Sequence, residues 1–245
     1  MKMKVTINCD MGESFGIYQL GDDASLMPLI DLANIACGFH GSDPNHMAKT
    51  VELACRHDVR IGAHPSLPDL QGFGRREMKI PRAELANIII YQVGALNGFL
   101  QKEGLSLNHI KPHGALAGMA FKDPEIAHTI CDVADIFQVP ILGLPGTVEE
   151  DVIRQRGHPF IAEFYADLEY DDKGLLIITQ KHAPVDPALA AKRVEKAVTK
   201  GKMDSVSGKE ISVYVNSVCV HSDTPNAVEV ATAVRDVLNR LQKPS

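Results

Sequence analysis

Residues 32–57 read LANIACGFHGSDPNHMAKTVELACRH and contain one complete unit of strand, loop and helix. The apolar run Leu32–Cys37 is typical of a buried strand. Asp43 then supplies a helix-capping side chain, and Pro44 fits the first helical position. Apolar residues recur at helical spacing beyond this point, so we expect an amphipathic helix over Pro44–His57.

The same alternation of strand and helix continues along the 245-residue chain. Short apolar runs predict seven strands, at Lys4–Cys9, Leu32–Cys37, Arg60–Ala63, Asn108–Lys111, Val139–Leu142, Phe160–Phe164 and Ser217–Val220. Longer periodic segments predict helices at Pro44–His57, Pro81–Glu103, Asp123–Phe137, Thr147–Arg156, Pro187–Lys200 and Pro225–Leu241. Such alternation implies a parallel sheet, and its length favours a closed α/β barrel forming one domain over residues 1–245, with an open doubly wound sheet as the alternative.

The composition excludes several classes of protein. With 45% hydrophobic and 23% charged residues, the chain is neither disordered nor fibrous. The net charge of −6 comes from interspersed charges without a basic stripe, which argues against a nucleic-acid or membrane partner. Five widely spaced cysteines predict neither a disulfide framework nor a structural zinc site. The N-terminus lacks the apolar core of a signal peptide, so we expect a cytoplasmic location.

Ionisable and polar residues gather after the predicted strands. In a parallel α/β fold the carboxyl ends of the strands meet at one face, where active sites form. We therefore expect these residues to form one polar site there. They are Asn8, Asp10 and Glu13, His40 and Asp43, His64, Arg75 and Arg76, Lys111 and His113, Glu163 and Asp167, and His221 and Asp223.

The predicted cluster permits two kinds of chemistry. Its histidines and carboxylates suit general acid–base catalysis, which we favour. They also suit a divalent metal, for which Asp10, His40 and His64 are the candidates. Lys111 is a candidate base, nucleophile or oxyanion stabiliser, or simply a structural ion pair with a nearby carboxylate.

The pair Arg75-Arg76 lies in a glycine-rich loop. It suits a carboxylate or phosphate, and a solvated loop is the equal alternative. Neither a P-loop nor a Rossmann glycine pattern occurs in the chain, and no GxSxG motif indicates a serine hydrolase. The chain therefore has no evident nucleotide-binding loop of its own.

Several motifs, in order along nearly the whole chain, resemble those of the LamB/YcsF family. They are NCDMGESFG at 8–16, NIACGFHGSDP at 34–44, GAHPSLPD at 62–69, GFGRR at 72–76, KPHGAL at 111–116, EFYAD at 163–167 and VHSDTP at 220–225. The resemblance implies a seven-stranded (β/α) barrel similar to the glycoside hydrolase/deacetylase superfamily. It also implies the A-subunit role in a 5-oxoprolinase, a lactam-utilisation enzyme.

The implied reaction is ATP-dependent opening of 5-oxo-L-proline to L-glutamate, with subunits B and C as partners. The resemblance then implies catalytic roles for Asp10, Glu13, His64, Lys111 and His113. Among these, Asp10 and His64 would activate water. Substrate or phosphoryl contacts would fall to Asn8, His40, Asp43, Arg75, Arg76, Glu163, Asp167, His221 and Asp223.

Two rival functions remain open on sequence grounds. The first is a metal-dependent deacetylase or amidohydrolase that acts alone on a sugar or small amide. It would need neither ATP nor a partner, and a chelator would abolish its activity. The second is a non-enzymatic module that binds a carboxylated ligand. The number of ionisable groups at strand ends disfavours this second rival, since burying them unpaired is costly.

Overall fold

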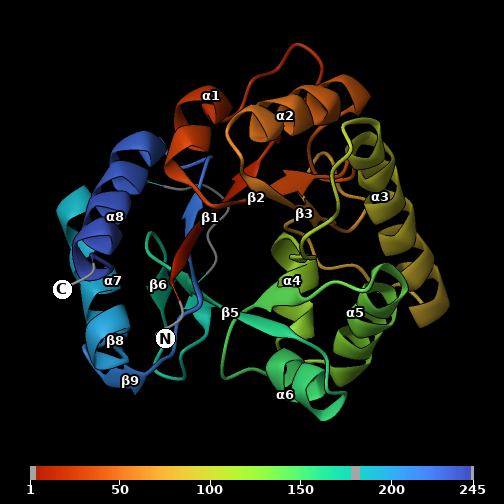
Figure 1. The fold of residues 1–245 in the computed structure, drawn as a ribbon. Helices are drawn as coiled ribbons and strands as arrows, with labels where there is room; N and C mark the ends of the chain where they lie inside the picture. Colours follow the sequence, from red (N-terminus) through yellow and green to blue (C-terminus); the bar gives the residue numbers. More distant parts are fainter. Residues whose placement is uncertain (1–3, 178–182, 244–245) are drawn as a thin grey trace.

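A six-stranded parallel sheet forms the centre of the computed structural model, which describes residues 4–177 and 183–243. Its strands are β1 Thr6–Met11, β2 Leu32–Ala36, β3 Arg60–His64, β4 Ile141–Gly143, β5 Phe160–Tyr165 and β10 Ser217–His221. They lie in the order β3, β2, β1, β10, β5 and β4, and the sheet curls around a central axis (Figure 1). All neighbouring strands are parallel, which confirms the α/β class and the parallel sheet.

The predicted strand Asn108–Lys111 contributes only one bridging residue, so the count of seven strands is wrong by one. Ile110 forms isolated parallel bridges to Ala63 of β3 and to Ile141 of β4. It therefore lies between the two edge strands and pairs with both. Pro112 follows almost at once and has no N–H group to donate, which stops the ladder from growing into a strand.

Six longer helices surround the sheet (Figure 1). They are α2 Pro44–Arg56, α3 Arg82–Lys102, α5 Pro124–Phe137, α6 Val148–Gln155, α7 Pro187–Lys200 and α8 Ala227–Leu241. Each corresponds to a predicted helix, with ends that differ by at most two residues. This agreement reflects the strong 3.6-residue periodicity of long amphipathic helices.

The two predicted proline-started helices differ in outcome. The side chain of Asp43 accepts hydrogen bonds from the N–H groups of Asn45 and His46, so the predicted cap of α2 is confirmed. The start of α8 at Pro225 is wrong, because the helix begins at Ala227. The side chain of Asn226 instead makes two hydrogen bonds to the backbone of Val185, which holds the residues before α8 in a turn.

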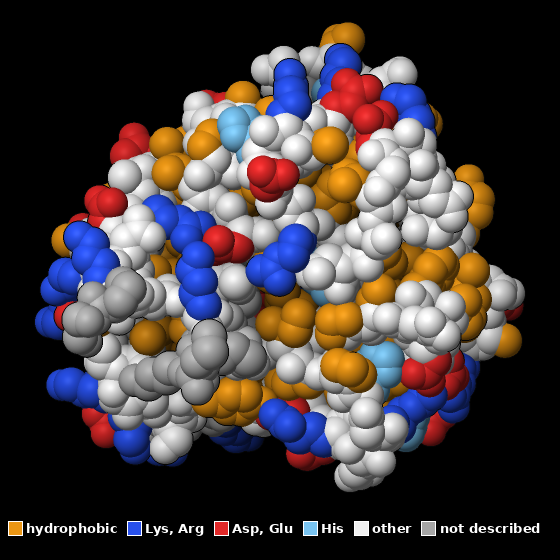
Figure 2. All heavy atoms as spheres, viewed as in Figure 1, with side chains coloured by type: hydrophobic (Ala, Val, Ile, Leu, Met, Phe, Trp, Pro, Cys, Tyr) orange, Lys and Arg blue, Asp and Glu red, His pale blue; other side chains and the backbone are white. Residues whose placement is uncertain are grey.

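Several short elements were not predicted from the sequence, because they are too short to show a period. They are the helices α1 Asp23–Leu26, η1 Met27–Leu29 and α4 Gly114–Ala120, and the hairpin pairs β6 Glu169–Tyr170 with β7 Leu176–Ile177 and β8 Lys202–Asp204 with β9 Glu210–Ser212. Within the described residues, no helix combines the length and apolar character needed to cross a bilayer. On the face in Figure 2, Lys and Arg side chains are interspersed with Asp and Glu side chains.

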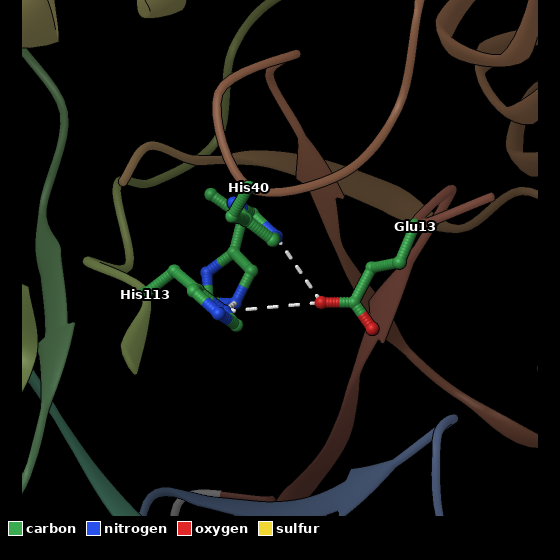
Figure 3. Close-up of side chains that lie close together, drawn as sticks. Glu13, His40 and His113 are labelled. Carbon is green, nitrogen blue, oxygen red and sulfur yellow. Dashed lines mark hydrogen bonds and ion pairs between the residues drawn. The ribbon is translucent and has the colours of Figure 1, made fainter. Parts of the chain in front are cut away.

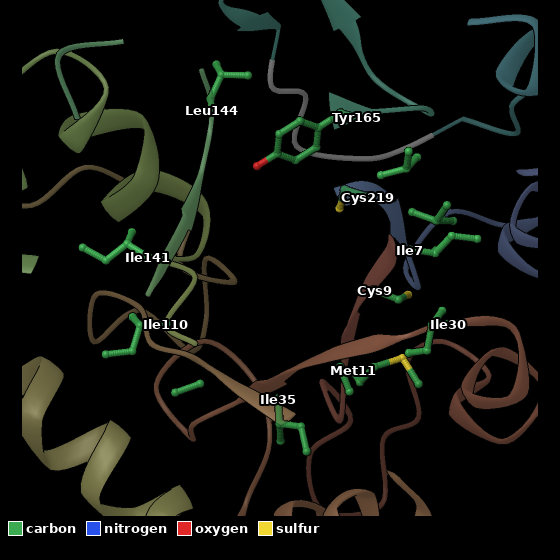
Figure 4. Packing of buried hydrophobic residues seen from close by; sticks show 14 of the residues in the cluster. Ile7, Cys9, Met11, Ile30, Ile35, Ile110, Ile141, Leu144, Tyr165 and Cys219 are labelled. Carbon is green, nitrogen blue, oxygen red and sulfur yellow. The ribbon is translucent and has the colours of Figure 1, made fainter. Parts of the chain in front are cut away.

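The two sides of β1 carry different chemistry, because alternate residues of a strand face opposite ways. Ile7, Cys9 and Met11 are fully buried and belong to the hydrophobic core (Figure 4). Asn8 and Asp10 face the other side, where the neighbouring strands present further polar groups. The inside of the curled sheet is thus polar at the carboxyl ends of its strands, and this position fixes where the site lies.

Candidate active site

Lys111 lies at the centre of a buried group of charges inside the curled sheet. Its Nζ is 2.8 Å from Oδ1 of Asp10 and 2.9 Å from Oε1 of Glu163. Burial opposes the charged amine, but Asp10, followed by Cys219 and Glu163, outweighs it and raises the pKa of Lys111 well above its ordinary value. Lys111 is therefore a cation at neutral pH, which suits oxyanion stabilisation and not base catalysis.

Asp10 is held as a carboxylate at the end of β1. Its Oδ1 accepts a hydrogen bond of 2.8 Å from the Asn34 side chain, and its Oδ2 lies 3.3 Å from Nε2 of His64. Burial opposes ionisation, but the charges of His64 and Lys111 together lower the pKa of Asp10 well below its ordinary value. Asp10 is therefore an ionised hydrogen-bond acceptor.

His221, at the end of β10, is held by Asp167. The Nδ1 of His221 is 3.0 Å from Oδ1 of Asp167, and the backbone N–H of His221 donates to Oδ2 of the same carboxylate at 2.8 Å. Burial lowers the pKa of His221, but the attraction of Asp167 outweighs it and raises that pKa to about 9. The ring stacks on Tyr165 and presents Nε2 3.8 Å from Oδ2 of Asp10. His221 thus adds a second cation beside Asp10.

The two predicted arginines point to different places. Arg75 forms a 2.7 Å ion pair with Asp223, and both side chains are about nine-tenths buried. Arg76 pairs with Asp69 inside its own loop, and its side chain is 56% exposed. The structure therefore brings Arg75 to the other predicted site residues but leaves Arg76 outside them.

Glu13, His40, His64 and His113 form a second buried cluster beside Asp10. Oε1 of Glu13 is 3.2 Å from Nε2 of His40 and 3.8 Å from Nδ1 of His113 (Figure 3). The rings of His40 and His113 stack with centroids 3.6 Å apart. Burial lowers the pKa of both His40 and His113 well below the ordinary value, so these two imidazoles are neutral. Burial, with Asp10 and Asp223, raises the pKa of Glu13.

Two of the predicted site residues, Asn8 and Asp43, form hydrogen bonds that hold neighbouring segments in place. Asn8 lies on the polar side of β1, donating to Oγ of Ser217 at 2.9 Å and accepting from the Asn34 side chain at 2.9 Å. Asp43 caps α2 and also accepts a hydrogen bond from the N–H of Gly16. Asp43 therefore lies at the edge of the site and not within it.

Some residues of the site were not selected from the sequence. The side-chain amide of Asn34 donates hydrogen bonds to Oδ1 of both Asn8 and Asp10. Nε2 of His109 lies 2.6 Å from Oδ1 of Asn34. The alternation within Leu32–Cys37 contained the signal for Asn34, since a polar side chain in a buried strand needs polar partners. His109 carried the same signal, since it is a polar residue within the predicted strand Asn108–Lys111.

A pocket opens over these groups. It is lined by the charged side chains Asp10, Arg75, Lys111 and His221, by His64 and His113, and by the apolar residues Ala117, Phe121, Tyr165, Leu168 and Leu176. An anionic ligand with an apolar ring or stem matches this lining, because cations and apolar surface are both within reach. The arrangement can bind such a ligand and stabilise negative charge that develops on it.

Similar proteins match this chain along almost its whole length. The "Lactam utilization protein lamB" of Emericella nidulans is 46% identical over 99% of this chain and 97% of its own. A protein of Pseudomonas aeruginosa that is named as a 5-oxoprolinase A subunit is 44% identical, covering 95% of this chain and 94% of its own.

A solved structure has the same fold. The crystal structure of the lactam utilization protein from Thermus thermophilus superposes with a TM-score of 0.90 at 42% identity, covering 98% of this chain and 97% of that chain. The model of the LamB/YcsF family matches residues 5–243. This match spans every strand and helix of the site, and the chain therefore belongs to the LamB/YcsF family.

Proposed function

We propose that this chain is the A subunit of an enzyme that opens 5-oxo-L-proline to L-glutamate in an ATP-dependent reaction with partner subunits B and C. The relatives named as A subunits of 5-oxoprolinase support the substrate and the presence of further subunits. The observation that carries the proposal is the pocket in which one carboxylate, Asp10, lies among Lys111, Arg75 and His221.

The lining of the pocket matches the proposed substrate. 5-Oxoproline has a carboxylate, a lactam carbonyl and an apolar ring edge. Arg75 presents a planar guanidinium, which suits the substrate carboxylate or a phosphoryl group. Phe121 and Leu168 offer apolar surface for the methylene groups of the ring. The ring would thus lie between the charged side chains of the pocket and the apolar side chains of Phe121 and Leu168.

The proposed chemistry begins with activation of the lactam. A five-membered lactam is unstrained and resonance-stabilised, so direct attack by water is slow. Transfer of the γ-phosphoryl group of ATP to the carbonyl oxygen makes the ring carbon electrophilic. Water then adds to that carbon, and the C–N bond breaks with protonation of the nitrogen, which gives γ-glutamyl phosphate. A second water hydrolyses this acyl phosphate, so the products are glutamate, ADP and inorganic phosphate.

Residues of the chain would assist the attack of water. Asp10 accepts the proton from water, and the cation of Lys111 stabilises the negative charge on the substrate oxygen. As this oxygen draws on the charge of Lys111, the attraction between Lys111 and Asp10 weakens, which makes Asp10 a better proton acceptor. Because the sequence contains neither a P-loop nor a Rossmann glycine pattern, ATP would be bound with the help of B and C.

The test is reconstitution. The chain mixed with B and C subunits, Mg-ATP and 5-oxoproline should release glutamate in proportion to the ATP consumed, and the chain alone should release none. Glutamate from the chain alone without ATP would show a self-contained amidohydrolase. Failure of the complete mixture, with all subunits folded, would show that another lactam is the substrate.

A further inference from the structure

The buried cluster of Glu13, His40, His64 and His113 is compact enough for a metal site, but its ring geometry does not fit one ion. One potential ligand atom from each residue lies within 4.8 Å of the others. The rings of His40 and His113, however, are stacked, with centroids 3.6 Å apart and an angle of 4° between their planes. An imidazole nitrogen directs its lone pair in the plane of the ring, so two stacked rings cannot both point at one cation. The cluster is therefore arranged as a hydrogen-bond network.

Backbone carbonyls fix one hydrogen on each of two rings in this network. Nδ1 of His64 is 2.7 Å from the carbonyl oxygen of Lys111, and Nε2 of His113 is 2.8 Å from that of Phe73. A carbonyl oxygen only accepts, so both of these nitrogens carry hydrogen. Phe73 has a φ of 54°, unusual for a bulky residue, in the turn that directs its carbonyl at His113. The fold therefore holds these two hydrogens in place.

The other nitrogens of the same two rings share a third hydrogen. Nε2 of His64 lies 2.9 Å from Nδ1 of His113, which is the length of an N–H···N hydrogen bond, so one of the two nitrogens donates. Three hydrogens thus lie on the four ring nitrogens, whereas two neutral imidazoles carry only one hydrogen each. The pair of His64 and His113 therefore holds one extra proton and a single positive charge.

The surroundings of the pair place this charge on His64. Oδ2 of Asp10 lies 3.3 Å from Nε2 of His64, so an ionised carboxylate faces the cation there. Burial lowers the pKa of His113 well below its ordinary value. The carboxyl nearest to His113 is Glu13, whose pKa is raised by burial and by neighbouring carboxylates, so it offers little negative charge. His64 is therefore the cation and donates from Nε2 to a neutral His113.

His64 lines the same pocket as Asp10 and Lys111. We propose that His64 is the cationic general acid that protonates the lactam nitrogen as the ring opens, and that neutral His113 keeps His64 in its protonated form by accepting the hydrogen bond. This inference deepens the proposed function and rests on it. His64 donates a proton in this role, and the activation of water is left to Asp10.

The proton balance of ring opening closes within the site. Asp10 takes a proton from the attacking water, the C–N bond breaks, and its electron pair moves to the nitrogen. The nitrogen takes the proton from Nε2 of His64, which becomes neutral. Protonated Asp10, whose Oδ2 is 3.3 Å away, then returns its proton to Nε2 of His64. The proton removed from water thus replaces the one delivered to the nitrogen.

His221 is the other cation beside Asp10, but its surroundings suit a different role. Burial lowers the pKa of His221, whereas Asp167, 3.0 Å from its Nδ1, outweighs burial and raises that pKa to about 9. Nδ1 of His64 donates instead to a neutral carbonyl group. Asp10 lies near both rings, but Asp167 stabilises only the cation of His221. His221 therefore keeps its proton and stabilises charge, and His64 is the better proton donor.

The first test detects the extra proton by NMR in the isolated ¹⁵N-labelled chain and needs no activity. At roughly pH 8, well above the ordinary histidine pKa of about 6.5, the ring of His64 should still carry hydrogen on both nitrogens. A ¹⁵N–¹⁵N coupling across the N–H···N bond should link it to His113, which assigns the signals in the parent chain without any variant. Neutral rings for both His64 and His113 at this pH would overturn the proposal.

The second test asks whether this proton is used in the reaction. In the mixture with B and C subunits, Mg-ATP and 5-oxoproline, His64→Gln should lower kcat at least about a hundredfold and leave KM nearly unchanged. The matched control is His57→Gln, since His57 is exposed on the surface, and this variant should behave as the parent chain does. Near-normal kcat in folded His64→Gln, or a loss mainly in KM, would overturn the role as acid.

A further variant keeps the second test decisive if His64→Gln does not fold. His113→Gln removes the neutral imidazole that accepts from His64, so it should abolish the ¹⁵N–¹⁵N coupling and lower kcat without raising KM. Unchanged kcat in folded His113→Gln would overturn the proposal. A parent mixture that forms no glutamate would overturn the role as acid together with the proposed function, whereas the NMR result would still decide whether the pair holds the extra proton.

Discussion

Glu149, in the first turn of α6, gives a prediction that can be worked out quantitatively. Its side chain is buried, and neither carboxylate oxygen has a hydrogen-bond partner among the described residues. The carboxyl lies against Gly143 of β4, where a side chain would collide with it. Burial, reinforced by the charge of Glu163, raises the pKa of Glu149 to about 8. Glu149 is therefore largely protonated in the folded protein at neutral pH.

This pKa shift has a defined effect on stability. The unfolded chain loses the proton near pH 4.5, whereas the folded chain keeps it until pH rises to about 8. The unfolded state therefore gains stability relative to the folded state as pH rises through this window. At about 1.4 kcal/mol for each pH unit, Glu149 should cost roughly 3 kcal/mol at pH 7 and roughly 5 kcal/mol above pH 8, relative to acidic conditions.

The assay is urea-induced unfolding of the parent chain and of Glu149→Gln, at several values from about pH 5 to about pH 8.5. Gln keeps the size but does not ionise, so the variant should gain stability relative to the parent as pH rises, by the amounts given above. The control is Glu229→Gln, because Glu229 is exposed on α8. Its difference from the parent should stay nearly constant. A constant difference for Glu149→Gln as well would refute the reasoning.

Three further predictions concern the site. Asp10→Asn should lower kcat in the reconstituted glutamate assay by at least about a hundredfold. The control Asp236→Asn, on the exposed surface of α8, should leave kcat unchanged. Near-normal kcat in folded Asp10→Asn would remove Asp10 from the mechanism. Lys111→Met should lower the free energy of unfolding by about 3–5 kcal/mol, because it leaves buried carboxylates unpaired, and urea unfolding near the parent value would contradict this. Gly62→Ala should lower the free energy of unfolding by about 1–3 kcal/mol, since the new methyl group would overlap the ring of His109. An unchanged urea midpoint would show that the ring moves freely.

The order and type of the main elements were determined by local sequence. The Asp43-Pro44 start and the long apolar stripes fix helices through neighbours only three or four residues apart, so each can be predicted without the rest of the chain. The strands of the sheet were found in the same way, and the alternation implied that they are parallel. Because parallel strands place their carboxyl ends together, the sequence also located the face on which the site forms.

Only the tertiary structure decided which of these residues meet. β1 pairs with β10, about two hundred residues away along the chain, and no local pattern specifies that pairing. Local signals also placed β1 at Lys4–Cys9, whereas its strand runs over Thr6–Met11. The local sequence also could not show that Ile110 would be the one residue of its segment that bridges the edge strands β3 and β4.

The site depended on the same long-range information. Arg75 and Arg76 are adjacent in sequence, yet the fold of their loop turns one to Asp223 and the other to Asp69. Of the three metal-ligand candidates Asp10, His40 and His64, the two histidines meet Glu13 and His113. Asp10 lies between His64 and Lys111. Residue type and strand position, which local sequence encodes, thus determined what chemistry is available. The direction of each side chain, and hence its partner, was set by the curling of the sheet and by packing between segments far apart in the chain.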